Sequence, residues 1–120
     1  MGVAREAITV VRVPGAFELP QTVKRLADSG SYDGIVPLGC IIRGETPHFD
    51  YLSQAVAQGL MRVSLGSPTP VVFGVLTVNT AEQALARVKK GAEVAESLIE
   101  LIQRLREMRG LRSASGFRQP

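Results

Sequence analysis

Two apolar runs, residues 35–42 and 71–78, restrict this 120-residue chain to a small set of folds. Each run is bounded by turn residues, a pattern that is typical of a strand covered on both faces of a parallel sheet. Between the runs, from Pro47 to about Leu65, apolar side chains recur at helical spacing. A strand, a helix and a second strand in this order predict a βαβ unit.

Further strands and helices are predicted on both sides of this unit. Residues 8–13 are mostly β-branched and predict a strand, and a helix is expected from about Phe17 to Ala27. Thr80 and Gln83 form a capping box, from which a long helix is expected to run to around Met108. This pattern predicts one α/β domain in which helices cover both faces of a parallel sheet.

The end of the chain carries two further predictions. Lys89-Lys90-Gly91 is expected to loosen or kink the last helix, because glycine weakens a helix interior. We expect the domain to span residues 1–109 and residues 110–120 to form a flexible tail. The apolar arc of the last helix is wider than one sheet face needs, which indicates association between subunits. Its members are Leu98, Ile99, Leu101, Ile102 and Leu105.

Composition excludes several classes of protein. Hydrophobic residues make up 45% of the chain, enough for one domain with a core, and no apolar run is long enough to span a membrane. The net charge of +3 comes with only 5% aromatic residues and no nucleic-acid-binding motif, so we expect neither nucleic acid nor membrane as a partner. The single cysteine, Cys40, is expected in the core. It cannot form an internal disulfide, and with no signal peptide evident at Met1 this favours the cytoplasm.

The segment after residues 35–42 carries the chemistry. Arg43-Gly44 is expected to form a tight turn, followed by Thr46 as helix N-cap and Pro47 as first helical residue. Free backbone amides at a helix N-terminus bind anions such as phosphate. His48, the only histidine, falls in the first turn, where the helix dipole favours the neutral imidazole and hence a base. The same residues also suit a capping turn with a surface histidine, and these residues alone do not decide between the two readings.

Other kinds of site are not supported. No Gly-x-Gly-x-x-Gly motif or Walker loop follows a strand, and no cluster of histidine, cysteine and carboxylate residues has metal-ligand spacing. We therefore expect no metal and no nucleotide cofactor. In parallel sheets a ligand lies beyond the carboxyl ends of the strands, and the segments that follow all three predicted strands are rich in polar and turn residues.

Three motifs together resemble the 6,7-dimethyl-8-ribityllumazine synthase family. They are Val13-Pro-Gly-Ala-Phe-Glu-Leu-Pro20, Gly39-Cys-Ile-Ile-Arg-Gly-Glu-Thr-Pro-His-Phe-Asp-Tyr51 and Phe73-Gly-Val-Leu-Thr77. The resemblance implies a three-layer α/β/α, flavodoxin-like fold and riboflavin biosynthesis. The implied reaction joins 5-amino-6-(D-ribitylamino)uracil to 3,4-dihydroxy-2-butanone 4-phosphate, without a cofactor. It also implies a homo-oligomer, a pentamer or a shell of pentamers, whose active sites lie between subunits.

The resemblance also implies a role for particular residues. His48 would move protons during imine formation and phosphate loss. The ribityl chain would lie against Ala16, Phe17 and Glu18, and the pyrimidine against Cys40, Ile41, Ile42 and a neighbouring subunit's copy of Phe73. The phosphate would be bound by Gly44, Glu45, Thr46, Arg87 and Lys90.

The chain departs from the family pattern in two places. Family members begin with a further strand and helix. That first strand lies in the sheet between the strand that matches residues 8–13 and the strand that matches residues 35–42. Residues 87–91 are also shorter than the usual loop. Two alternatives therefore remain: a truncated, non-catalytic homologue that binds a ligand or assembles a shell, and an unrelated flavodoxin-like phosphate-binding module.

Overall fold

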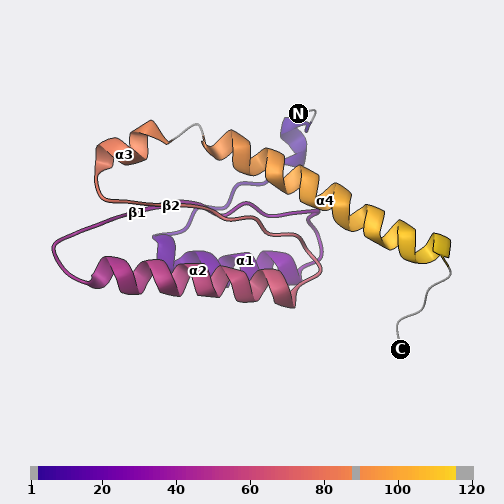
Figure 1. Cartoon of the computed structure of the whole chain (residues 1–120), viewed down its shortest axis with the longest axis horizontal. Helices are drawn as coiled ribbons and strands as arrows, with labels where there is room; N and C mark the ends of the chain where they lie inside the picture. The colour runs from indigo at the N-terminus through magenta and orange to yellow at the C-terminus, as the bar shows by residue number, and fades with distance from the viewer. Residues whose placement is uncertain (1–2, 88–89, 116–120) are drawn as a thin grey trace.

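The computed structural model describes residues 3–87 and 90–115, and side chains within residues 3–87 and 91–110. Its sheet has two parallel strands, β1 (Leu38–Ile42) and β2 (Gly74–Val78), paired from Leu38 with Gly74 to Ile42 with Val78. On one side of the sheet lie α1 (Leu19–Asp28) and α2 (His48–Gly66). On the other lie α3 (Ala81–Ala86) and α4 (Lys90–Ser115), so the elements form three layers (Figure 1).

The core lies between the sheet and the α1–α2 layer. Val56 of α2 is fully buried, and Leu60 is 3% exposed one turn later. They belong to one apolar cluster with residues of α1 and of both strands. Gly59 lets the two helices approach closely, because a Cβ there would lie 2.9 Å from the Pro20 ring. This packing fixes the start of α2 relative to the end of β1.

The βαβ unit is confirmed, with shorter strands than the sequence predicts. Pairing begins with a bridge between Ile35 and Val71, but the continuous ladder starts only at Leu38. Pro37 lies between these points, and proline has no N–H to donate to a ladder. The prediction of strands covered on both faces is wrong for β1, since Leu38 is 61% and Ile42 47% exposed.

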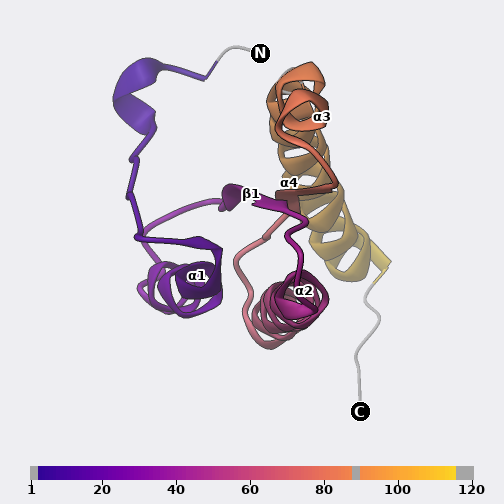
Figure 2. The ribbon, with the colours of Figure 1, turned by 90° about the vertical axis from the view of Figure 1, so that its left-hand side faces the viewer.

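The predicted strand at residues 8–13 is also wrong. This segment runs beyond β1 on the side away from β2 and then leads into α1 through a short 3-10 helix, Ala16–Glu18 (Figures 1 and 2). Val10 is 71% exposed, and of residues 8–13 only Val13 packs against the core. Its β-branched residues favour a strand, but a strand also requires a neighbour with free N–H and C=O groups within reach. Within residues 3–87 and 90–115 no strand lies beside it.

The helices agree more closely with the sequence. The predicted helix at residues 17–27 is the 3-10 turn and α1, and Gly30 beyond it adopts φ 69°, the left-handed conformation that glycine favours. The Thr80 hydroxyl accepts a hydrogen bond from the Gln83 amide at 3.2 Å, as expected of a capping box. The prediction of a single long helix is wrong, because α3 ends at Ala86 and α4 begins at Lys90.

The C-terminal part extends the last helix further than predicted. Helix α4 continues to Ser115, past the predicted end near Met108, so residues 110–115 are helical. The predicted tail at residues 116–120 lies outside the described residues, as does Lys89 of the predicted kink, whereas Lys90 and Gly91 begin α4. None of the described helices is both long and apolar enough to cross a bilayer.

The buried face of α2 gives a test of this packing. Leu60→Ala should lower the free energy of unfolding by roughly 2–5 kcal/mol, because it leaves a cavity in the core. Leu65→Ala, at a side chain on the same helix that is 80% exposed, should change it by less than about 0.5 kcal/mol. Urea unfolding followed by circular dichroism measures both. Equal losses in the two variants would contradict the described packing.

Candidate functional site

A cavity of about 270 Å³ opens at the carboxyl end of β1. The 3-10 turn, the end of β1, the following loop and the first turns of α2 together form its walls. Its lining residues are Ala16, Cys40, Ile41, Ile42, Gly44, Thr46, His48, Phe49 and Leu52. This first cavity brings together residues that are 36 positions apart in the sequence. Eight of the nine come from β1, the loop after it and the first turns of α2.

The loop before α2 differs in detail from the expected cap. Pro47, not Thr46, is the N-cap, and the helix begins at His48. The Pro47 carbonyl accepts hydrogen bonds from the amides of Asp50 at 3.0 Å and Tyr51 at 3.3 Å. The Thr46 hydroxyl still contributes to the cap, because it accepts a hydrogen bond from the His48 amide at 3.4 Å. The prediction therefore located the helix start one residue too early.

Backbone amides in this loop are available to a ligand. Within the described part of the chain, the amides of Gly44, Glu45 and Thr46 donate to no protein acceptor. The φ of Gly44 is not positive, so the loop does not use the left-handed conformation that glycine allows. A Cβ on Gly44 would meet nothing within 4 Å, so the space over its backbone is open. A phosphate oxygen can approach amides in such a loop, where the dipole of α2 favours negative charge.

The Ala16–Glu18 segment contributes less to the first cavity than the resemblance implies. Ala16 lines it, whereas Phe17 is 62% exposed and lies outside the lining. The half-buried Glu18 side chain folds back toward Gly15, where a Cβ would lie 3.2 Å from Oε1. The turn itself is fixed by a hydrogen bond from the Glu18 amide to the Gly15 carbonyl at 3.2 Å.

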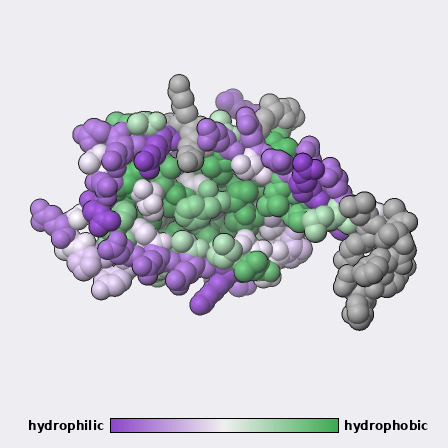
Figure 3. Space-filling model, in the orientation of Figure 1, coloured by the Kyte–Doolittle hydropathy of each residue, from purple (hydrophilic) through white to green (hydrophobic). Residues whose placement is uncertain are grey.

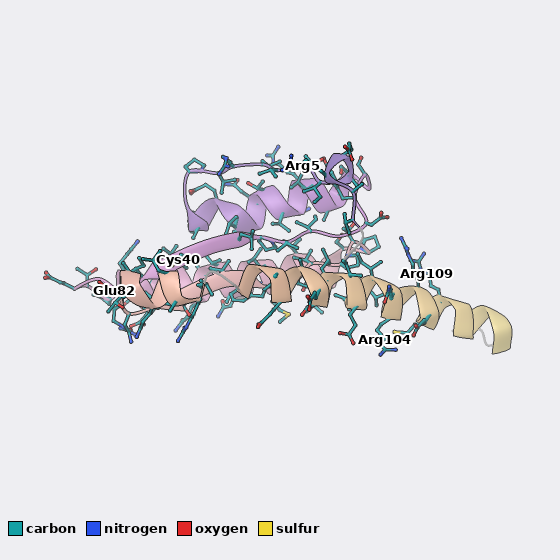
Figure 4. The ribbon with its side chains drawn as sticks, turned by 90° about the horizontal axis from the view of Figure 1, so that it is seen from above. Arg5, Cys40, Glu82, Arg104 and Arg109 are labelled. Carbon is teal, nitrogen blue, oxygen red and sulfur yellow. The ribbon has the colours of Figure 1, made fainter. Side chains whose placement is uncertain are left out.

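The expectation that Cys40 is a core residue is wrong. It is exposed, although it lies on a strand. In Figure 4 it lies toward the same end of the molecule as Glu82 of α3. Its side chain therefore lines the first cavity without being enclosed by the core.

A second cavity, of about 540 Å³, lies on the α3–α4 side of the sheet. It contains two of the predicted site residues, Phe73 and Arg87, beside residues of β1, β2 and α4. The two cavities share no lining residue. The Lys90 side chain lies outside the described residues, so its predicted contact with phosphate stays a prediction.

A polar cluster that the sequence did not predict lies beside the first cavity. Arg43 Nε donates to Asn79 Oδ1 at 2.9 Å, and Arg43 Nη2 lies 3.7 Å from Asp50 Oδ1. The guanidinium also lies 4.5 Å from the centroid of the Phe49 ring. The signal in the sequence was the position of Arg43 and Asn79, each directly after one of two strands expected to be neighbours.

Two basic residues of α4, Arg104 and Arg109, are distant from the first cavity. Arg104 and Arg109 lie along the opposite half of the molecule from Cys40 (Figure 4). Arg104 is paired with Glu100 at 3.8 Å and with Glu107 at 3.3 Å, and Arg106 with Asp33 at 3.5 Å.

The first cavity combines apolar walls with a small number of polar groups. Ile41, Ile42, Phe49 and Leu52 suit the faces of a flat ring, while free amides and the Thr46 hydroxyl suit an anion. His48 lies between these regions in the sequence and can accept or donate a proton. The arrangement is suited to proton transfer on a small organic anion.

Comparison with known proteins gives consistent matches. The family model for 6,7-dimethyl-8-ribityllumazine synthase matches residues 1–106. The 6,7-dimethyl-8-ribityllumazine synthase of Nitratidesulfovibrio vulgaris strain DP4 is 46% identical over 112 residues, which cover 89% of this chain and 72% of that protein. The protein of the same name from strain Hildenborough of this species matches with the same identity and coverage.

Proposed function

The chain belongs to the 6,7-dimethyl-8-ribityllumazine synthase family, an enzyme family of riboflavin biosynthesis, and from this we propose how its residues perform the reaction. In this proposal 5-amino-6-(D-ribitylamino)uracil condenses with 3,4-dihydroxy-2-butanone 4-phosphate. The products are 6,7-dimethyl-8-ribityllumazine, inorganic phosphate and water. The observation that carries the assignment of residues is that His48, Thr46 and Ile41 line one cavity.

The phosphate is assigned to the loop before α2. The free amides of Gly44, Glu45 and Thr46 support this assignment, because they can donate to phosphate oxygens without losing protein hydrogen bonds. Binding there leaves the reactive carbon of the butanone near the first turn of α2. The loss of phosphate then occurs where the helix dipole stabilises the departing negative charge.

His48 is assigned the proton transfers. Attack of the uracil amine on the butanone carbonyl forms a carbinolamine, and loss of water from it gives an imine. The amine must lose a proton and the hydroxyl must gain one, and an imidazole can do both in turn. The position of His48 in the cavity, directly after the phosphate loop, supports this role.

The remaining residues are assigned to the pyrimidine and the ribityl chain. Cys40, Ile41 and Ile42 would contact the pyrimidine, and Ala16, Phe17 and Glu18 the ribityl chain. Ala16 and residues 40–42 already line the cavity. Phe17 and Glu18 would contact the ligand from the rim of the cavity. The exposure of the Phe17 side chain supports this role, because an exposed side chain is free to contact a bound ligand.

We assign Phe73, Arg87 and Lys90 to a neighbouring subunit's active site. The first cavity, at about 270 Å³, is smaller than most small-molecule sites, which span roughly 300–1,000 Å³. Phe73 and Arg87 lie in a separate cavity of the same chain, which is the arrangement expected if each site is completed by its neighbour. An extended apolar surface between α2 and α4, along the outer side of β2, is available for such contact (Figure 3).

We also propose that the two-stranded sheet is part of a larger, flavodoxin-like sheet. Residues 8–13 run along the side of β1 that has no described partner, with Ile8 58% exposed (Figure 2). A strand placed between them and β1 would give both segments hydrogen-bond partners. This proposal explains why a β-branched segment remains outside the two-stranded sheet.

The role of His48 can be tested directly. His48→Ala should lower kcat by about 10²–10⁴-fold while changing the affinity for either substrate little, because an assisting base is lost and the phosphate loop is kept. Steady-state kinetics and equilibrium binding measure the two effects. Gln54→Ala, at an exposed position of the same helix, is the control and should retain full turnover. Full turnover in His48→Ala would disprove the assigned role.

The role of Arg87 gives a second test. Arg87→Ala should weaken binding of the butanone phosphate by about 10-fold or more, since a charge-assisted hydrogen bond is lost, and leave the affinity for the ribitylaminouracil nearly unchanged. The exposed Arg62 of α2 supplies the control variant, Arg62→Ala, for which neither affinity should change. Equal weakening of both substrates by Arg87→Ala would mean that the residue acts only on the fold.

Assembly is the third test. Light scattering during size exclusion should give a mass near five times that of the 12.9 kDa chain, or a larger multiple for a shell. A folded monomer at micromolar concentration would overturn the shared site.

The shared site itself can be tested by mixing subunits. His48→Ala and Arg87→Ala chains are each expected to be impaired. When they are unfolded and refolded together, some sites receive the native His48 from one subunit and the native Arg87 from the other. Activity above the sum of the two variants is therefore expected, and strict additivity would contradict a site shared between subunits.

A further inference from the structure

We propose that Arg43 is a positioning residue for the reaction, which holds the phosphate loop and His48 in register with the end of β2. The inference rests on the function proposed above for residues 44–48. Arg43 directly follows β1, and its amide donates to the Val78 carbonyl at 2.9 Å, which extends the strand pairing by one bond. Its side chain is not part of the lining of either cavity, so it acts on the site through its neighbours.

Three contacts orient the guanidinium. Nε donates to Asn79 Oδ1 at 2.9 Å, which joins it to the residue after β2. Nη2 lies 3.7 Å from Asp50 Oδ1, and the Cζ atom lies 4.5 Å from the Phe49 ring centroid. Phe49 and Asp50 are the two residues directly after His48, so Arg43 holds the first turn of α2 from two directions.

The contact also reaches the helix that precedes Arg87. The Asn79 amide donates to Gln83 Oε1 at 2.7 Å, and the Gln83 amide donates to the Thr80 hydroxyl at 3.2 Å. Asn79 is therefore bound both to Arg43 and to the first turn of α3. Through Asn79, one arginine connects the loop assigned to phosphate with the helix that ends directly before Arg87.

The exposure of this cluster distinguishes positioning from general stability. The side chains of Arg43 and Asp50 are 50% and 53% exposed, and exposed ion pairs contribute little to the stability of a fold. A planar guanidinium can donate in one direction and stack on a ring in another, whereas a lysine ammonium cannot reproduce both contacts. The loss of Arg43 should thus disturb the geometry of the loop more than the unfolding of the chain.

The loss of Arg43 should affect turnover through the position of the loop. Catalysis is sensitive to small displacements, since a shift of about 1 Å in a reacting group can cost on the order of 100-fold in rate. If Arg43 fixes the loop, its removal should lower kcat and raise KM for the butanone phosphate. KM for the ribitylaminouracil should remain close to that of the unmodified protein.

The experiment compares four variants of the full chain: Arg43→Ala, Arg43→Lys, Asn79→Ala and the double variant Arg43→Ala/Asn79→Ala. The exposed Arg25 of α1 provides the control, Arg25→Ala. Thermal unfolding is measured for each, followed by steady-state kinetics with both substrates. Because the chain has a single histidine, histidine labelled with ¹³C at Cε1 gives one His48 ring signal, which is followed during titration with inorganic phosphate.

Arg43→Ala should lower kcat/KM for the butanone phosphate by roughly 10- to 100-fold and shift the His48 signal of the free protein, with Tm changed by only a few degrees. Arg43→Lys should also lower kcat/KM for the butanone phosphate. The double variant should have a kcat/KM no lower than that of the more impaired single variant, because both residues act in one contact. The Arg25→Ala variant should match the unmodified chain.

The proposal would be overturned by an unchanged His48 signal and kcat/KM in Arg43→Ala, or by strictly additive losses in the double variant. A large fall in Tm with equal losses for both substrates would also overturn it, since that pattern indicates a structural role alone. If the unmodified chain binds phosphate without turnover, the proposed reaction fails, but the His48 signal and the phosphate affinity of the variants still decide the role of Arg43.

Discussion

The parallel pairing of β1 with β2 is the constraint on which the site depends. Parallel strands place their carboxyl ends at one edge of a sheet, and the register that pairs Ile42 with Val78 brings Arg43 beside Asn79. A crossover helix must then begin just beyond β1, so α2 starts at His48, next to the same edge. A one-residue slip in the register would turn Ile41 out of the core and separate Arg43 from Asn79. The core thus fixes the geometry of the loop that is assigned to phosphate.

The distribution of chemistry over two cavities follows from the same topology. The α1–α2 face of the sheet is closed by apolar packing around Val56, while the α3–α4 face is covered only in part. Phe73, which lines the second cavity, is 50% exposed although it directly precedes β2. Large apolar side chains left in solvent at the edge of a cavity are typical of an interface. The exposed surface therefore supports the assignment of Phe73 and Arg87 to a neighbouring subunit.

Local patterns in the sequence predicted more than patterns that depend on distant partners. The Thr80–Gln83 cap was found because both residues lie within one helical turn, and α2 because its apolar spacing persists over several turns. Cys40 and residues 8–13 were predicted incorrectly, since burial and strand pairing depend on what lies beside them. The contacts of Arg43 could not be predicted from local patterns for a related reason. Its partner Asn79 is 36 residues away, and only the strand register brings them together.

The open side of β1 connects the fold with the proposed assembly. Its residues alternate between a buried Ile41 and an exposed Cys40 and Ile42, so one face is packed while the other is in solvent. Unpaired N–H and C=O groups on a strand edge invite pairing with a further strand. A strand paired there would bring its own side chains beside Cys40, Ile41 and Ile42, which line the first cavity. Completion of the sheet and completion of the site would therefore involve the same three residues of β1. For this reason the shape of the pyrimidine site should depend on how that edge is covered.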